Sequence, residues 1–166
     1  GFADGLVSVQ DPAAQMAAAL LDPAPGSRVL DACAAPGGKA AHLLERADLD
    51  LLALDLKPSR CRRVAENLAR LGLHASLKAA DCARLDTWWD GRPFDAVLTD
   101  VPCTASGVVR RNPDAKWLRR ETDIASFAKT QARILDALWQ VVQPGGKLLY
   151  VTCSVFSEEN TGQISR

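Results

Sequence analysis

The feature of this sequence that most restricts its fold is a regular alternation of short apolar runs with amphipathic segments of helix length. Five runs have the length of buried strands: residues 28–32, 51–54, 75–79, 94–99 and 148–152. Helical spacing or a helix-starting residue marks four further segments: 12–21, 38–46, 58–71 and 124–142. Because alternating strands and helices imply right-handed crossovers, we predict an α/β fold with a mainly parallel sheet covered by helices on both faces.

Residues at the ends of these segments predict where the helices begin and end. Asp11 is placed to cap the first helix, with a proline in its first turn. The Pro-Gly-Gly sequence at 144–146 is expected to end the helix that begins near Ile124. Ser157 is expected to cap another helix, whose first turn then holds two glutamates. The stretch 101–120 has no apolar period and is predicted to be a long loop.

Composition places the chain among globular proteins. The 166 residues are 48% hydrophobic, which is enough for one packed domain and excludes intrinsic disorder. No run approaches the ~20 apolar residues of a membrane helix, and no signal peptide opens the chain. The five cysteines form no C-x-x-C pair, so neither a disulfide framework nor a zinc site is indicated, and free thiols are typical of a cytoplasmic protein. Since the chain opens with Gly1 and stops inside a helical pattern, we expect residues 1–166 to be an excerpt of a longer protein.

Aspartates and a thiol follow the predicted strands. Ligands of parallel sheets bind beyond the carboxyl ends of the strands. The residues at those ends are Asp31, Asp55, Asp81, Asp100 and the Thr-Cys-Ser turn at 152–154. We therefore expect four carboxylates and a thiol to meet at one edge of the sheet, and we expect the functional site there.

The first strand end opens a glycine-containing turn, Asp31-Ala-Cys-Ala-Ala-Pro-Gly-Gly-Lys39. Small residues let a ligand approach the backbone closely, and the helix N-terminus that follows favours a negative group. The turn is neither G-x-G-x-x-G nor a Walker sequence, and it could simply be a tight strand-to-helix connection. Asp55, which lies 24 residues after Asp31, could accept hydrogen bonds from two ribose hydroxyls, and Asp81 could accept one from an adenine amino group. Together these residues favour a nucleoside cofactor.

Two cysteines lie at neighbouring strand ends. Cys103 comes three residues after Asp100, and Cys153 follows the last strand. A single cysteine is usually a small buried hydrophobe, but two of them beside a carboxylate indicate chemistry. Because Cys153 precedes a predicted helix N-terminus, we expect the pKa of its thiol to be lowered, which makes it a candidate nucleophile. The two histidines, His42 and His74, have no evident Ser or Cys partner, which disfavours a hydrolase triad.

The predicted loop contains a cluster of positive charge at residues 110–120, which we call the basic loop. Its five cations surround Trp117 and are Arg110, Arg111, Lys116, Arg119 and Arg120. The whole chain has 20 Lys and Arg against 20 Asp and Glu, so its zero net charge gives no general support for nucleic-acid binding. The basic loop could be a solvated surface loop. Its cations beside an aromatic side chain, close to Cys103, instead favour contact with a phosphate backbone.

These motifs resemble those of the RNA cytosine-5 methyltransferases, in particular the branch that acts on bacterial small-subunit ribosomal RNA (Sun/Fmu type). The resemblance runs in order through nearly the whole chain: Val9-Gln10-Asp11, Asp31 to Lys39, Asp55, Asp81, Asp100-Val-Pro-Cys103, Arg111-Asn-Pro-Asp114 with Lys116-Trp117, and Thr152-Cys153-Ser154 with Glu158-Glu159-Asn160. The glycine turn is only moderately specific, because ribose methyltransferases have a similar Ala-Pro-Gly-Gly, whereas the two cysteine motifs together are highly specific. The resemblance implies a Rossmann-like class I S-adenosylmethionine-dependent methyltransferase fold, without the N-terminal RNA-binding domain and the last two strands that family members usually carry.

The resemblance also implies a role for each matched residue. The site for S-adenosyl-L-methionine would comprise Cys33, Ala34, Ala35, Pro36, Gly37, Gly38, Lys39, Asp55, Asp81 and Asp100. Cys153 would add to carbon 6 of cytosine, which makes carbon 5 nucleophilic. Asp100 would hydrogen-bond the cytosine edge, and Cys103 would assist the later loss of the carbon 5 proton and of the thiol. The partner would be small-subunit ribosomal RNA with its target base unstacked, and a monomer without a metal or a membrane is expected.

Three other interpretations stay open at the level of sequence. Cys103 could be the nucleophile, as the cysteine of the Pro-Cys motif is in DNA cytosine-5 methyltransferases, although the Thr-Cys-Ser turn argues against this. A ribose 2'-O methyltransferase would need a lysine-rich catalytic set and would leave Cys153 idle. A non-catalytic RNA-binding or assembly module could also have retained the fold.

Overall fold

The computed structural model describes all of residues 1–166. Five strands form one sheet: β1 (Arg28–Asp31), β2 (Asp50–Asp55), β3 (Ser76–Ala79), β4 (Phe94–Asp100) and β5 (Val142–Val151). The helices are α1 (Pro12–Leu21), α2 (Gly38–Arg46), α3 (Pro58–Arg70), α4 (Ala115–Leu118), α5 (Glu121–Trp139) and α6 (Thr161–Ile164). Short 3₁₀ turns cover Leu85–Thr87, Ser106–Val108 and Ser157–Glu159.

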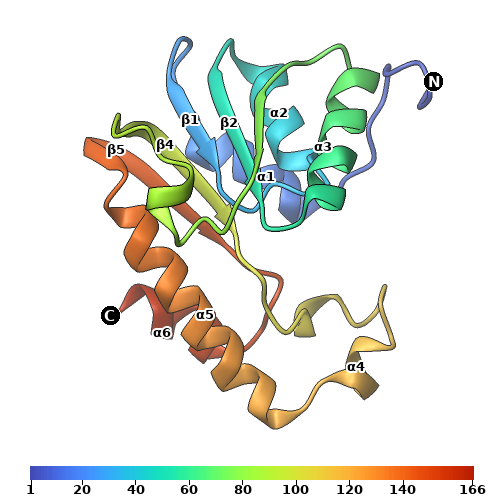
Figure 1. The fold of residues 1–166 in the computed structure, drawn as a ribbon. Helices are drawn as coiled ribbons and strands as arrows, with labels where there is room; N and C mark the ends of the chain where they lie inside the picture. The colour runs from blue at the N-terminus through green and yellow to red at the C-terminus, as the bar shows by residue number, and fades with distance from the viewer.

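The sheet is parallel throughout, in the strand order β3-β2-β1-β4-β5 (Figure 1). From β1 the chain first extends the sheet through β2 and β3, and it then returns to add β4 and β5 on the other side of β1. The strand order therefore reverses between β1 and β4, and open α/β sheets bind their ligands at the carboxyl ends of the strands beside such a reversal. The predicted α/β fold with a parallel sheet is confirmed.

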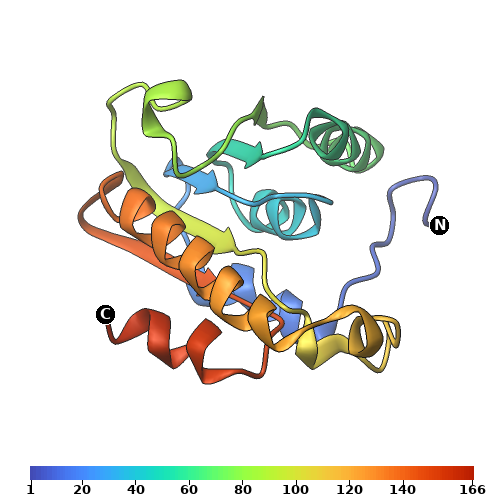
Figure 2. The same cartoon turned by 60° about the horizontal axis from the view of Figure 1, so that its bottom comes forward.

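Helices cover both faces of this sheet. Successive residues of β1 point to opposite faces, so Val29 packs with Leu21 of α1 and Leu43 of α2, whereas Leu30 packs in the core that holds Ile134 of α5. The long helix α5 runs along β4 and β5 (Figure 2). Burial on both faces explains why the strands have nearly continuous apolar runs instead of an alternating pattern.

The start of β5 departs from the prediction. The helix α5 ends at Trp139, and the Pro-Gly-Gly sequence at 144–146 lies inside β5 instead of ending the helix. The pairing of β5 with β4 shifts register between Phe94 and Ala96. The glycines produce this irregularity: Gly145 has a φ of +82°, and a Cβ on Gly146 would lie 2.9 Å from a backbone oxygen of β4. They therefore form a bulge in an edge strand.

The segments after β4 and β5 also differ in part from the prediction. The loop 101–120 contains a 3₁₀ turn and the short helix α4, which the absence of an apolar period did not predict. Ser157 is the first residue of a 3₁₀ turn, and its side chain caps no helix. The four-residue helix α6 follows that turn. No helix of the chain has the length and apolar character needed to cross a membrane.

Candidate active site

The strand ends meet as predicted. The strands β1, β2 and β4 end at Asp31, Asp55 and Asp100 respectively, and Asp81 lies two residues beyond the end of β3. Lys39, in the first turn of α2, reaches across the strand edge and places its Nζ 2.5 Å from Oδ2 of Asp100. The glycine turn, the carboxylates and both cysteine loops therefore occupy one edge of the sheet.

The turn at residues 33–39 is held tightly against the sheet. The N–H of Ala34 donates to Leu54 in β2 at 2.8 Å, and the N–H of Ala35 donates to Oδ2 of Asp55 at 3.3 Å. Gly37 has a φ of +102°, and a Cβ there would lie 3.2 Å from Val64 of α3. Only glycine fits both the left-handed conformation and this close approach. The turn thus positions the N-terminus of α2 over the end of β1.

Asp31 is a buried carboxylate with no hydrogen-bond partner. It is 1% exposed, and both of its carboxylate oxygens lack a partner. Burial, followed by the nearby negative charge of Asp100, raises the pKa of Asp31 to about 7, although Lys39 opposes this rise. Buried polar groups are nearly always paired, so this carboxylate marks a position where a cationic or hydrogen-bonding ligand fits.

Asp55 and Asp81, two of the three aspartates of the predicted cofactor site, are accompanied by arginines. The Nε of Arg60 lies 3.6 Å from Oδ2 of Asp55. Arg133 of α5 donates to Oδ2 of Asp81 at 2.9 Å. Burial raises the pKa of Asp81, but the hydrogen bonds from Arg133 and from the N–H of Ala83 outweigh it and hold this pKa below its usual value. Arg133 was not predicted from the sequence, where it lies 52 residues from its partner.

The two cysteine loops bring their thiols into contact. The Sγ atoms of Cys103 and Cys153 are 3.3 Å apart, with Cys103 buried and Cys153 exposed. The hydrogen bond from Cys153 lowers the pKa of Cys103 to about 7, and the same bond, followed by burial, raises the pKa of Cys153 well above its usual value. Cys103 is therefore the more acidic thiol of the pair.

The predicted lowering of the Cys153 pKa is wrong for a physical reason. The segment after Cys153 begins with a single 3₁₀ turn, so no long helix presents its N-terminus to the thiol. The neighbouring thiol, which the sequence places 50 residues away, controls the protonation of Cys153 instead.

A pocket of about 350 Å³ opens in front of Cys153. Its walls include Lys39, Asp100, Cys153, Asp11 at the start of α1 and Arg111 of the basic loop. Arg111 donates to Oδ2 of Asp11 at 2.5 Å, and so it ties the basic loop to α1. The pocket thus places a thiol, two carboxylates and two cationic side chains around one small volume.

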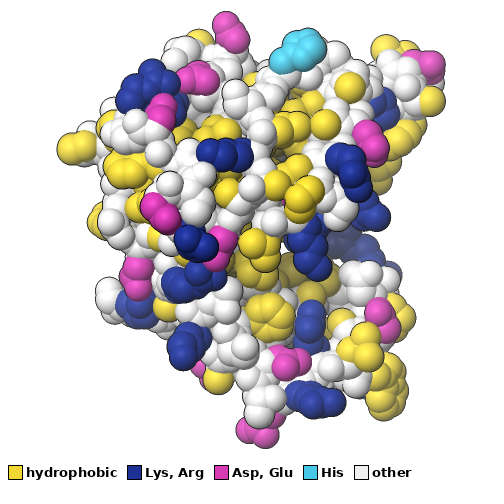
Figure 3. Space-filling model, in the orientation of Figure 1, with side chains coloured by type: hydrophobic (Ala, Val, Ile, Leu, Met, Phe, Trp, Pro, Cys, Tyr) yellow, Lys and Arg dark blue, Asp and Glu magenta, His cyan; other side chains and the backbone are white.

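Two of the five cations of the basic loop bind oxygen atoms of other segments of the chain. Arg111 pairs with Asp11, and Arg119 donates from Nε to the carbonyl oxygen of Thr104 at 2.8 Å. Arg110, Lys116 and Arg120 form no ion pair. In Figure 3 Lys and Arg side chains line a hollow between the part of the molecule that holds α2 and α3 and the part that holds α4. A local basic surface therefore exists on a chain of zero net charge.

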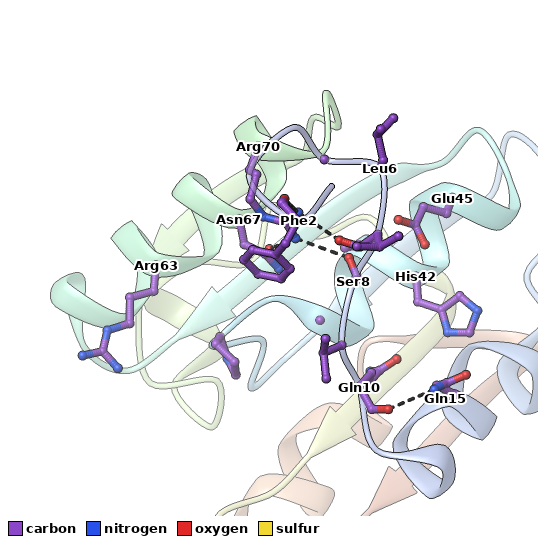
Figure 4. Close-up of a pocket in the computed structure, with 16 residues that line it drawn as sticks. Phe2, Leu6, Ser8, Gln10, Gln15, His42, Glu45, Arg63, Asn67 and Arg70 are labelled. Atoms are coloured by element: carbon purple, nitrogen blue, oxygen red, sulfur yellow. Dashed lines mark hydrogen bonds between the residues drawn. The ribbon is translucent and has the colours of Figure 1, made fainter.

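A larger pocket of about 710 Å³ lies on the outer side of α2 and α3, away from the thiols (Figure 4). Arg70 of α3 fixes the N-terminal segment beside it by donating to the carbonyl oxygens of Phe2 and Val7, at 2.7 and 3.2 Å. The segment then runs past the glycine turn, where the Nε2 of Gln10 lies near Gly38. This anchoring places the start of α1 at the mouth of the smaller pocket.

A group of buried polar residues behind the thiols was not predicted from the sequence. Glu159 is fully buried and accepts hydrogen bonds from Thr104, Ser154 and Gln131. Gln131 is buried in α5 on the same side as Ile134 and Leu138, and a polar residue on the apolar face of a helix is a signal of a buried network.

The parallel sheet with its reversal beside β1, the glycine turn and the carboxylates at the strand ends define a Rossmann-like fold of the methyltransferase class. The model of the family "16S rRNA methyltransferase RsmB/F" matches residues 18–166, and the chain therefore belongs to this family. The family resemblance of the motifs is thereby confirmed.

Individual relatives agree with this assignment. The chain is 58% identical over 165 residues to ribosomal RNA small subunit methyltransferase B of Xylella fastidiosa (strain Temecula1 / ATCC 700964), and the match covers 99% of this chain and 38% of the relative. Among solved structures, PH0851 matches with a TM-score of 0.95 and 36% identity, covering 99% of this chain and 38% of the other. NSun6 from Pyrococcus horikoshii, crystallised with SFG, matches with a TM-score of 0.90 and 32% identity, covering 99% of this chain and 42% of the other. The chain thus spans less than half the length of these relatives.

Proposed function

We propose that residues 1–166 form the catalytic domain of an S-adenosylmethionine-dependent enzyme that methylates carbon 5 of a cytosine in small-subunit ribosomal RNA. The observation that carries this proposal is the pair of thiols 3.3 Å apart, at the edge of the sheet that also holds Asp100. A thiol nucleophile with an adjacent base is what addition to a cytosine ring requires.

The strand edge fits the proposed cofactor. The partnerless carboxylate of Asp31 suits the cationic methionine end of S-adenosylmethionine, since a buried carboxylate gains most from a positive partner. The glycine turn at 33–39 suits close approach of the ligand, and Asp55 and Asp81 suit its ribose and its adenine. When bound, S-adenosylmethionine supplies an electrophilic methyl group.

Cys153 is the proposed nucleophile. As its Sγ forms a bond to carbon 6 of cytosine, its proton passes to the Sγ of Cys103, which is 3.3 Å away, when this more acidic thiol is ionised. The electron pair of the carbon 5–carbon 6 double bond is then available at carbon 5. Asp100, held by Lys39, hydrogen-bonds the edge of the cytosine ring and orients it.

Cys103 is the proposed base of the second half of the reaction. After carbon 5 has been methylated, Cys103 releases its first proton to solvent and takes the proton of carbon 5. The electrons of that carbon–hydrogen bond restore the ring double bond, and the bond between carbon 6 and Cys153 breaks. The two sulfurs are left with one proton between them, as they were before the attack.

The basic surface supports RNA as the substrate. A cytosine inside a helix cannot present its ring face to Cys153, so the target base must leave its stack and enter the 350 Å³ pocket. Arg111 of the basic loop lines this pocket. Arg110, Lys116 and Arg120 belong to the same loop and form no ion pair, so they are the proposed contacts to phosphates.

Methylation of small-subunit ribosomal RNA in vitro tests the proposal. The chain is incubated with the RNA and with labelled S-adenosylmethionine, and the digested nucleosides are separated. We expect the label in 5-methylcytidine, and none in the reaction with Cys153→Ala. Label in a 2'-O-methylated nucleoside, or methylation that survives Cys153→Ala, would contradict the proposal.

A further inference from the structure

A buried carboxylate lies directly behind the two thiols. Glu159, the last residue of the 3₁₀ turn Ser157–Glu159, has no exposed surface. Its backbone is fixed because its carbonyl oxygen accepts a hydrogen bond from the hydroxyl of Tyr150 in β5 at 2.8 Å. Its side chain points into the space between the two cysteine loops, where it accepts four hydrogen bonds.

Three of these four bonds come from the residues that follow the two cysteines. Thr104, which follows Cys103, donates its N–H to Oε1 at 2.9 Å and its hydroxyl to Oε2 at 2.5 Å. Ser154, which follows Cys153, donates its hydroxyl to the same Oε2 at 2.5 Å. One carboxylate oxygen therefore joins the two loops that carry the reactive sulfurs.

Two further side chains complete the frame on the other side of each cysteine. The Nε2 of Gln131 in α5 donates to Oε1 of Glu159 at 3.0 Å and to the carbonyl oxygen of Pro102 at 2.9 Å. Asn160 donates to the carbonyl oxygen of Ser154 at 3.0 Å and accepts from the hydroxyl of Thr152 at 2.7 Å. Each residue next to a cysteine is thus held by a hydrogen bond. Gln131 binds Pro102, Glu159 binds Thr104 and Ser154, and Asn160 binds Thr152.

Glu159 itself pairs with no cation, since it belongs to none of the ion pairs of the protein. Although burial raises the pKa of Glu159, the hydrogen bonds from Ser154 and Thr104 outweigh it and keep this pKa below its usual value. An ionised carboxylate is costly to bury unless its donors are well placed, and donors that satisfy it are held in place in return. The frame is therefore stiff on the side of the loops where the thiols meet.

We propose that Glu159 is a positioning residue that fixes the sulfur atoms of Cys103 and Cys153 against one another by binding Thr104 and Ser154 together. The part of Glu159 in the reaction rests on the function proposed for the two thiols, since Glu159 does not line the pocket in front of Cys153. The physical claim, that Glu159 sets the distance between the sulfurs, is independent of that function.

The equilibrium between the thiol pair and its disulfide measures this distance in solution. In a glutathione buffer, oxidised glutathione accepts two electrons and becomes two reduced molecules, while the two cysteines lose two protons and form one sulfur–sulfur bond. The constant for this exchange rises as the sulfurs are held closer together. Trypsin cuts after Arg110 and after Lys147, so the two thiols fall on different peptides and their disulfide is measured separately from the other cysteines by mass spectrometry.

Three variants test the role of the carboxylate. In Glu159→Ala the loops lose their common acceptor, and we expect the exchange constant of the 103–153 pair to fall at least about 10-fold. Glu159→Gln keeps one acceptor oxygen for the N–H of Thr104, and its amide can donate to the two hydroxyls, so this variant should recover most of the loss. Glu158→Ala changes the exposed neighbouring glutamate and should match the wild type. A wild-type constant in folded Glu159→Ala, or a loss in Glu159→Gln as large as in Glu159→Ala, would overturn the proposal.

Milder variants keep the test decisive if Glu159→Ala does not fold. Thr104→Val and Ser154→Ala each remove one hydroxyl donor of the frame. We expect each to lower the same constant at least about 3-fold, and unchanged constants in both would overturn the proposal.

Methyl transfer provides a separate readout. A mispositioned nucleophile should lower kcat by about 10- to 100-fold while the affinity for S-adenosylmethionine is unchanged, because the frame does not touch the turn at 33–39. If the wild-type chain transfers no methyl group, the proposed function fails while the disulfide measurement still decides the role of Glu159.

Discussion

Replacing Asp31 by asparagine should raise the free energy of unfolding more at pH 8 than at pH 5. The wild-type carboxylate is buried without a partner, and its pKa is raised from 3.8 to about 7. An acid whose pKa is higher in the folded state than in the unfolded state destabilises the fold as pH rises between the two values. Asparagine has nearly the same shape and no charge, so the Asp31→Asn variant escapes this loss.

The magnitude follows from the two pKa values. Each tenfold difference in proton affinity corresponds to 1.36 kcal/mol, so above pH 7 the ionised carboxylate costs the fold about 4 kcal/mol. At pH 5 the unfolded carboxyl is already mostly ionised, and the cost is about 1.5 kcal/mol. The difference in unfolding free energy between Asp31→Asn and the wild type should therefore grow by about 3 kcal/mol from pH 5 to pH 8 in favour of the variant.

Urea unfolding at these two pH values measures the effect. Burying the asparagine amide has the same cost at both pH values. This cost therefore cancels when the difference between variant and wild type at pH 8 is compared with the difference at pH 5. Asp48→Asn is a matched control, because that carboxylate is exposed, and its effect should stay within about 0.5 kcal/mol at either pH. If Asp31→Asn shifts stability equally at pH 5 and pH 8, the carboxylate is not held in the raised-pKa state that we infer.

Two further predictions concern the ligands. Asp55→Ala should weaken binding of S-adenosylmethionine by about 1–3 kcal/mol, because ribose hydroxyls lose their acceptor, and equal affinities by calorimetry would remove Asp55 from the site. Neutralising Arg110 and Lys116 together should weaken the salt dependence of binding to single-stranded RNA. The slope of log affinity against log salt concentration should become smaller in magnitude by about 0.7 for each phosphate contact that is lost. An unchanged slope would mean that the loop is only a solvated surface. Cofactor affinity should be the same in that double variant and the wild type.

The fold could be predicted largely from local patterns. Each buried strand has its own apolar run, and the helix starts at Pro12, Gly38 and Pro58 agree with the structure. The glycines at 145 and 146 predict the end of a helix, but glycine also permits bulges. Only the pairing with β4 distinguishes the two roles.

The site could be predicted in part. The aspartates at the strand ends were found because parallel strands bring their carboxyl ends together whatever lies between them. The contact between Cys103 and Cys153, the pairing of Arg133 with Asp81 and the burial of Glu159 all join residues more than 25 apart in the chain. A sequence alone carries no sign of such contacts, and a glutamate after a serine looks like an exposed first-turn residue.

Covalent capture of the RNA tests the central claim most directly. In the full-length protein with natural RNA and S-adenosylmethionine, Cys103→Ala should still allow attack and methylation, because the exposed Cys153 can lose its proton to solvent. It should not allow release, so a protein–RNA adduct should accumulate on a denaturing gel. Cys153→Ala should give no adduct, either with natural RNA or with RNA that contains 5-fluorocytosine. An adduct in Cys153→Ala and none in Cys103→Ala would reverse the two roles. If even the wild type forms no adduct with the fluorinated RNA, the covalent mechanism is contradicted.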